Sequence, residues 1–208
     1  MNNKELCMNN KEFYCPAYTD FPDIELYMDQ VISVLEKHLE PYFGEEKCIT
    51  STMINNYVKN HILPPPENKR YGRGHLAHLY IICFFKQFMQ LSDISVLLEK
   101  LWEELGEEKA YTLFRRELER AYCAVSQSEP VSAPVPATVA QQVLRTACVA
   151  AIAILHSRHV FLEAGFVPRD QEEEQKEKAR KEKEKEDKER EKREKKEKKE
   201  KKVKEKKD

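Results

Sequence analysis

The chain has 208 residues, and its 36 Lys and Arg side chains nearly balance 37 Asp and Glu side chains. The charges are unevenly distributed, because residues 169–208 hold 20 basic and 16 acidic side chains and almost no apolar ones. Only residues 1–168 therefore carry enough apolar surface for a hydrophobic core. The apolar stretch Ala147–Leu155 is too short to span a bilayer, and the N-terminus does not resemble a signal peptide. We therefore expect a cytoplasmic protein that makes no membrane contact.

Residue usage also argues against several kinds of chemistry. The six cysteines include no CxxC pair, so we expect reduced and mostly packed thiols. The chain has only 5 glycines and lacks the GxxxxGK[ST] and GxGxxG loops that bind nucleotide phosphates. It also lacks a nucleophile elbow and an HExxH motif. The sequence thus predicts neither an enzyme nor a bound cofactor.

Apolar residues recur at helical spacing, and no segment alternates as a strand does. Asp23 is the expected cap of the first helix, with Pro41 and Gly44 marking its end. From caps, stops and apolar stripes, we expect helices over residues 23–40, 50–60, 73–89, 92–105, 110–125 and 138–162. The helix at 73–89 is apolar on most sides, which is typical of a helix at the centre of a core. The sequence therefore predicts an all-α fold, with at most a small hairpin near residues 62–72.

Composition divides the chain into four parts. They are a flexible N-terminus at 1–20, a helical domain at 21–105, a second helical region at 106–168 and a Lys/Glu-rich tail at 169–208. Ser126–Pro136 is rich in Ser and Pro, which is typical of a linker. In the last helix, Val143, Ala147, Ile154 and Phe161 are expected on the inner face, where they would form core, an effector pocket or a dimer seam.

The most informative passage runs from Thr52 to Arg73 and reads T-M-I-N-N-Y-V-K-N-H-I-L-P-P-P-E-N-K-R-Y-G-R. A capped short helix, a proline stop, a basic turn and a buried helix follow one another, as in a winged helix-turn-helix. The passage resembles the winged domain of the MerR regulators, whose pattern is roughly T-L-R-Y-Y, G-L-L-x-P, a basic wing and a leucine-rich helix. Residues 53–57 fall on T-L-R-Y-Y and residues 61–65 on G-L-L-x-P.

This chain departs from that pattern at three positions. Asn55 and Asn56 stand where the pattern has Arg and Tyr, and His61 stands where it has Gly, which leaves the shape of that turn open. Residues from about 20 to 120 resemble more closely an uncharacterised bacterial family of small MerR-like proteins, known only as a domain of unknown function. The most specific motifs of this resemblance are T-M-I-N-N-Y-V-K and P-P-P-x-x-K-R-Y.

Charge supports contact with DNA. Residues 48–90 hold five basic side chains and one acidic one, whereas the rest of residues 1–168 is strongly acidic. Positive charge is thus concentrated where phosphates would lie. Asn55 and Asn56 carry amides that can pair with adenine in the major groove, and Lys69, Arg70 and Arg73 suit phosphates.

The resemblance implies a DNA-binding transcription regulator that acts on double-stranded DNA. The expected DNA-binding residues are Thr52, Asn55, Asn56, Tyr57, Lys59, Lys69, Arg70, Tyr71 and Arg73. A homodimer is expected, because helix-turn-helix regulators usually bind two half-sites. A small-molecule effector or a protein partner is left open. The alternative function is a protein-interaction module on the same scaffold that no longer binds DNA.

Two further features have a functional and a simpler interpretation. His75 with His78, and His156 with His159, stand three residues apart and could each present two imidazoles to a metal, but closed zinc sites need four ligands, so we assign no metal. In the tail, Glu is followed four residues later by Lys or Arg at many positions, which predicts either a solvated single helix or a disordered segment.

Overall fold

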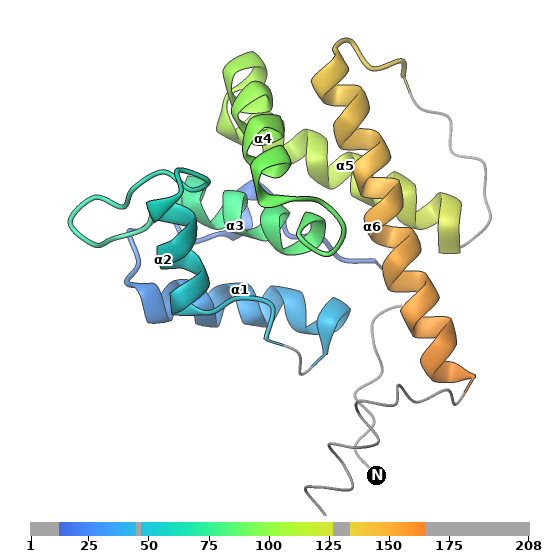
Figure 1. Ribbon diagram of the computed structural model, residues 1–208, viewed down its shortest axis with the longest axis horizontal. Coiled ribbons are helices and arrows are strands. Elements are labelled where there is room, and N and C mark those ends of the chain that lie inside the picture. The colour runs from blue at the N-terminus through green and yellow to red at the C-terminus, as the bar shows by residue number, and fades with distance from the viewer. Residues whose placement is uncertain (1–12, 45–46, 127–133, 165–208) are drawn as a thin grey trace, which may run out of the picture. The chain divides into compact units, whose positions relative to one another are not determined.

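A computed structural model of the chain describes residues 13–44, 47–126 and 134–164. Its described residues form one short 3-10 helix and six α-helices, without a strand (Figure 1). The elements are η2 (Tyr18–Asp20), α1 (Met28–Phe43), α2 (Ser51–Lys59), α3 (Arg73–Phe85), α4 (Leu91–Leu105), α5 (Glu107–Ser126) and α6 (Val139–Glu163). The all-α prediction is therefore confirmed for these residues.

The core is built around α3, as its all-round apolar sequence predicts. Ten of its 13 residues, from Leu76 to Phe85, are buried. α1, α4 and α5 pack against it, and α2 packs against α1 (Figure 1). α5 also contacts α4, so the predicted second helical region shares one core with the first.

The helix ends follow local chemistry. The hydroxyl oxygen of Thr50 accepts the backbone N–H of Met53 (3.2 Å), which fixes the start of α2. At the start of α1, the Gln30 side chain accepts the N–H of Tyr27 (2.9 Å). The predicted cap, Asp23, lies outside the helix. Pro41 lies inside α1, which ends at Phe43, three residues beyond the expected end at residue 40.

Residues 13–20 are ordered, although the sequence suggested a flexible terminus through residue 20. Cys15 is buried, and the hydroxyl of Tyr111 in α5 donates to the carbonyl of Pro16 (3.1 Å). The ring of Phe21 packs edge-on against the ring of Tyr111. Aromatic contacts thus attach this segment to the core.

The last helix packs with a different face from the one expected. Its buried residues are Leu144, Ala147, Cys148, Ala151, Ile152, Leu155 and His159. Val143 and Phe161, predicted on the inner face, are exposed, and Ile154 is half-buried; only Ala147 is inside. Both faces of this helix are rich in apolar residues, which is why the periodicity indicated the wrong one.

The chain divides into two units, Met1–Val160 and Phe161–Asp208, so all but the last three residues of α6 belong to the first. By length and composition, Val139–Phe161 could cross a membrane, and this segment is longer than the apolar stretch considered from sequence. About 33% of its most apolar part is buried inside the protein. Core helices of soluble proteins can be equally long and apolar, so the segment is weak evidence for a membrane span. The predicted Lys/Glu-rich tail lies outside the described residues.

Candidate nucleic-acid interface

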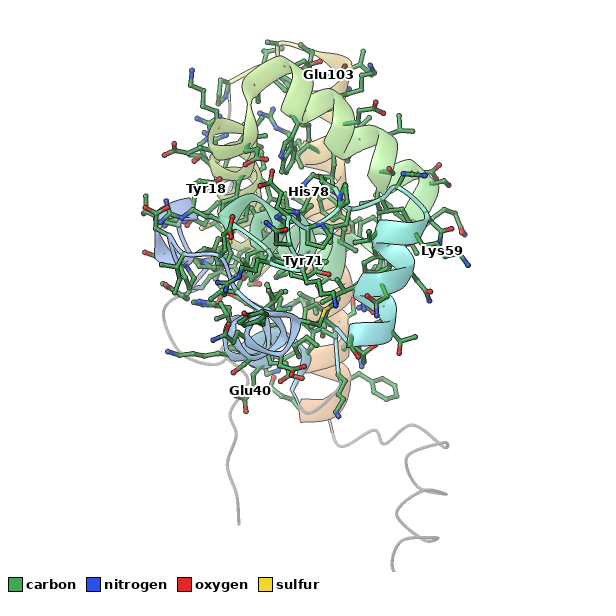
Figure 2. The ribbon with its side chains drawn as sticks, turned by 90° about the vertical axis from the view of Figure 1, so that its left-hand side faces the viewer. Tyr18, Glu40, Lys59, Tyr71, His78 and Glu103 are labelled. Carbon is green, nitrogen blue, oxygen red and sulfur yellow. The ribbon has the colours of Figure 1, made fainter. Side chains whose placement is uncertain are left out.

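The exposed face of α2 consists of polar and basic side chains. Thr52, Asn55, Asn56 and Lys59 are all exposed, and their spacing of three and four residues places them on one helix face. α2 contains no acidic residue. Figure 2 shows Lys59 pointing away from the helical body at the C-terminal end of α2. The face can therefore offer hydrogen-bond donors and acceptors and a positive charge to a ligand.

The opposite face of α2 is held by the core. Ile54 is fully buried and Tyr57 is 5% exposed. Burial raises the pKa of Tyr57 to about 12, because the phenolate would be desolvated. Lys86, at the end of α3, donates to the carbonyl of Cys48 and contacts the sulfur of Met53 (3.7 Å). These contacts fix the orientation of α2 against α3.

The chain leaves α2 through a left-handed residue. His61 has a φ of 57°, a conformation that glycine favours and most residues avoid. The backbone N–H groups of Ile62 and Leu63 then return to the carbonyl of Tyr57 (2.8 and 3.1 Å). His61 thus adopts the conformation of the glycine that the MerR pattern has at this position, so the turn keeps a left-handed residue despite the substitution.

The basic loop after the prolines ends in a tight turn. Asn68 and Lys69 both have positive φ (48° and 63°), and the N–H of Arg70 donates to the carbonyl of Glu67 (2.8 Å). Two central residues with positive φ are typical of a type I′ hairpin turn. Beyond it, Tyr71 pairs through its backbone with Leu26 (2.9 Å in each direction). The predicted small hairpin is thus reduced, in the described chain, to isolated bridges.

The two arginines of this region have different surroundings. Arg70 is exposed; its guanidinium donates to the hydroxyl of Tyr27 (2.9 Å) and lies over that ring, 4.7 Å from its centroid. Arg73 donates to the carbonyl of Phe21 (3.0 Å) and pairs with Asp23 (3.4 Å). Arg73 is thus engaged in holding the N-terminal segment, whereas Arg70 lies at the surface on a tyrosine.

The nine expected DNA-binding residues therefore separate into three groups. Six lie at the surface: Thr52, Asn55, Asn56, Lys59, Lys69 and Arg70. Tyr57 and Tyr71 are 5% and 3% exposed and contribute to packing. Arg73 is partly buried with the protein partners described above.

The first histidine pair serves the start of α3. The N–H of Gly72 donates to Nδ1 of His75 (3.1 Å), which caps the helix. His78 packs against Trp102 at 4.4 Å between ring centroids, and burial, helped by the nearby His75, lowers its pKa to about 4. Within the described ranges, no three His, Cys, Asp or Glu side chains gather as a group that could hold a metal ion.

Two partners in this region could not be found from sequence. Tyr27 and Asp23 lie more than 40 residues before the arginines that they contact, and no spacing rule connects them. In α5, the buried Glu117 has one further partner of this kind, Arg145 of α6 (2.8 Å), beside its helical neighbour Arg120 (2.7 Å), which the spacing of three residues does predict.

These features define an all-helical protein that exposes an acid-free capped helix followed by a basic turn. The chain matches the family described as Domain of unknown function (DUF1836) over residues 16–124. This match covers more than half of the chain, so the protein belongs to that family. It extends across the boundary expected at residues 105 and 106. No curated protein and no solved structure matches the chain significantly.

Proposed function

We propose that this protein is a DNA-binding transcription regulator that uses α2 and the turn at residues 67–70 in the manner of a MerR-like winged helix-turn-helix. The observation that carries the proposal is the face of α2. Thr52, Asn55, Asn56 and Lys59 are exposed together on a helix without carboxylates. An exposed polar helix of this kind fits the width of the major groove.

The amides supply the base-reading chemistry. Asn side chains form paired hydrogen bonds with the N6 and N7 edge of adenine. Because Asn55 and Asn56 are adjacent and both exposed, they can address neighbouring base pairs. The buried Ile54 and Tyr57 restrain the helix, so the amides are positioned before DNA arrives.

The basic residues supply orientation. Lys59, Lys69 and Arg70 are exposed, and a cation near a phosphate positions the protein without reading sequence. Arg70 remains exposed while its guanidinium rests on Tyr27, which limits its freedom before binding. We leave Arg73 out of the phosphate set, because its donors are directed at Phe21 and Asp23.

The test is a selection of binding sites from random duplex DNA, followed by competition between the selected site and random DNA. We expect an Asn55→Ala/Asn56→Ala variant to lose about 10-fold or more in preference for the selected site, since a good bidentate contact is worth about 1–3 kcal/mol. Gln87→Ala, at an exposed amide beyond α3, is the matched control and should leave the preference unchanged. Failure of the wild type to enrich any site contradicts the proposal.

A second candidate function, docking of a protein partner, has one observation in its favour. Ile24 is 67% exposed and Tyr27 is 54% exposed, both just before α1, and Tyr27 also contacts Arg70. Large apolar side chains at such exposure suit a protein contact better than a phosphate backbone. If docking is the function, Ile24→Asp abolishes it, and Asn55→Ala/Asn56→Ala does not.

A further inference from the structure

A stripe of uncharged side chains runs along the outer side of α6. Its six positions are separated by three or four residues, the repeat of a helix that packs against another helix. They are Val143, Thr146, Ala150, Ala153, Ser157 and Val160. Val143 and Val160 are 38% and 48% exposed, and the two alanines are half-buried.

The borders of the stripe are largely uncharged as well. Val149 is 42% exposed on one side, and the half-buried Ile154 lies on the other. Of the two arginines in α6, Arg145 is directed inward to Glu117 (2.8 Å), and Arg158 lies near the end of the helix. An uncharged helix face of this length, with a packed core on its other side, is unusual for a surface exposed to water.

The order of residues is self-complementary when the helix is reversed against a copy of itself. With a two-fold axis between Ala150 and Ala153, Val143 faces Val160 of the other helix and Thr146 faces Ser157. Ala150 then faces Ala153. Valine meets valine, hydroxyl meets hydroxyl and alanine meets alanine, and the small central residues let the two backbones approach closely.

Most of the chain outside the described residues is a poor cover for this face. Residues 169–208 contain 36 charged side chains, and residues 1–12 and 127–133 are mostly polar in sequence; the apolar residues 165–168 number only four, against a stripe that runs from Val143 to Val160. Such segments gain little by covering an apolar face, because their charged and amide groups would lose hydration. A second copy supplies the same uncharged surface and faces little charge repulsion across it.

We propose that α6 is a self-association surface, along which two copies pair antiparallel with Ala150 and Ala153 at the two-fold axis. The proposal is independent of DNA binding, because the stripe lies outside α2 and the basic turn. It gives a two-fold related pair of protomers, which is an isologous contact that closes on itself.

The test is sedimentation equilibrium of the full chain with charges introduced at one facing pair. Thr146 and Ser157 are exposed, so Thr146→Lys and Ser157→Glu place charges without filling the core. Each single variant should weaken dimerisation at least about 10-fold, because a charge is desolvated beside an uncharged partner. The double variant should recover most of the affinity, since the introduced lysine then faces the introduced glutamate of the other copy in both symmetric layers.

The matched control is Val96→Glu, at an apolar position of α4 that is 57% exposed and distant from the stripe in sequence; it should leave the dimer intact. Helical circular dichroism checks that every variant is folded. A monomeric wild type at about 100 µM, or single variants that dimerise as tightly as the wild type, would overturn the proposal. So would weakened single variants that the double variant makes weaker still, because that is the result for parallel pairing.

Discussion

Glu117 of α5 and Arg145 of α6 form an ion pair, with Oε2 and Nε 2.8 Å apart, in which the glutamate side chain is 2% exposed and the arginine side chain 26%. Arg145 also donates to the other carboxylate oxygen (3.4 Å) and to the carbonyl of Pro134 (2.7 Å). One side chain therefore connects α6 with α5 and with the segment that precedes α6.

Removing that side chain should destabilise the fold. Arg145→Met leaves the buried carboxylate of Glu117 with fewer donors, so we expect a loss of about 1–3 kcal/mol in the free energy of unfolding. Arg116→Met is the control, because Arg116 is 53% exposed and 4.0 Å from Glu117. Urea unfolding of both variants measures the difference, and equal stability would contradict the assigned role of Arg145.

The left-handed backbone at His61 should be relieved by glycine. His61 has a φ of 57°, where glycine has no steric penalty, so we expect His61→Gly to stabilise the protein by about 0.5–1 kcal/mol. The neighbouring Asn60 has a φ of −94°, and Asn60→Gly should instead destabilise. Midpoints of urea unfolding report the sign for each variant, and destabilisation by both would argue against the left-handed conformation.

His78 should make stability depend on pH. Its folded pKa of about 4 lies below the ordinary value of 6.5, so the unfolded chain binds a proton more readily between these values. The free energy of unfolding is therefore highest above pH 6.5, where the ring is neutral in both states. It falls by up to about 3 kcal/mol as the pH decreases toward 4. The single Trp102, packed against His78, gives a fluorescence signal for unfolding.

The matched variant for this test is His78→Phe, which keeps a ring against Trp102 but cannot be protonated. It should flatten the dependence of the free energy of unfolding between pH 4 and 6.5. Some slope should remain, because burial also lowers the pKa of His38. An unchanged slope in His78→Phe would show that other groups cause the dependence.

Arg70 and Arg73 should separate DNA binding from stability. Arg70→Ala should weaken DNA binding and reduce the salt slope by about 1, as expected for one lost phosphate contact. Arg73→Ala should instead lower the free energy of unfolding by about 1–2 kcal/mol, because Phe21 and Asp23 lose their partner. Filter binding and urea unfolding are measured for both variants in parallel. Weaker DNA binding in Arg73→Ala, together with a loss of stability in Arg70→Ala, would contradict these two roles.

How far the sequence predicts this structure depends on the range of the interactions. The bounds of α2 could be predicted, because the residues that determine them, the cap Thr50 and the prolines that follow the helix, are close to it in sequence. The face of α6 could not be predicted, since both of its sides are apolar and only the packing of the fold decides which is covered. The roles of Arg70 and Arg73 also required the fold, which brings Tyr27 and Asp23 to them.

The most direct test of the central claim is the affinity for random-sequence duplex DNA, measured by fluorescence anisotropy at about 50 and 200 mM salt. Three phosphate contacts, from Lys59, Lys69 and Arg70, predict a loss of affinity of about 40-fold between these concentrations. Lys59→Glu/Lys69→Glu should abolish binding, while Lys109→Glu, at an exposed lysine of α5, should retain most of it. A folded wild-type protein that does not bind at the lower salt concentration would contradict the claim.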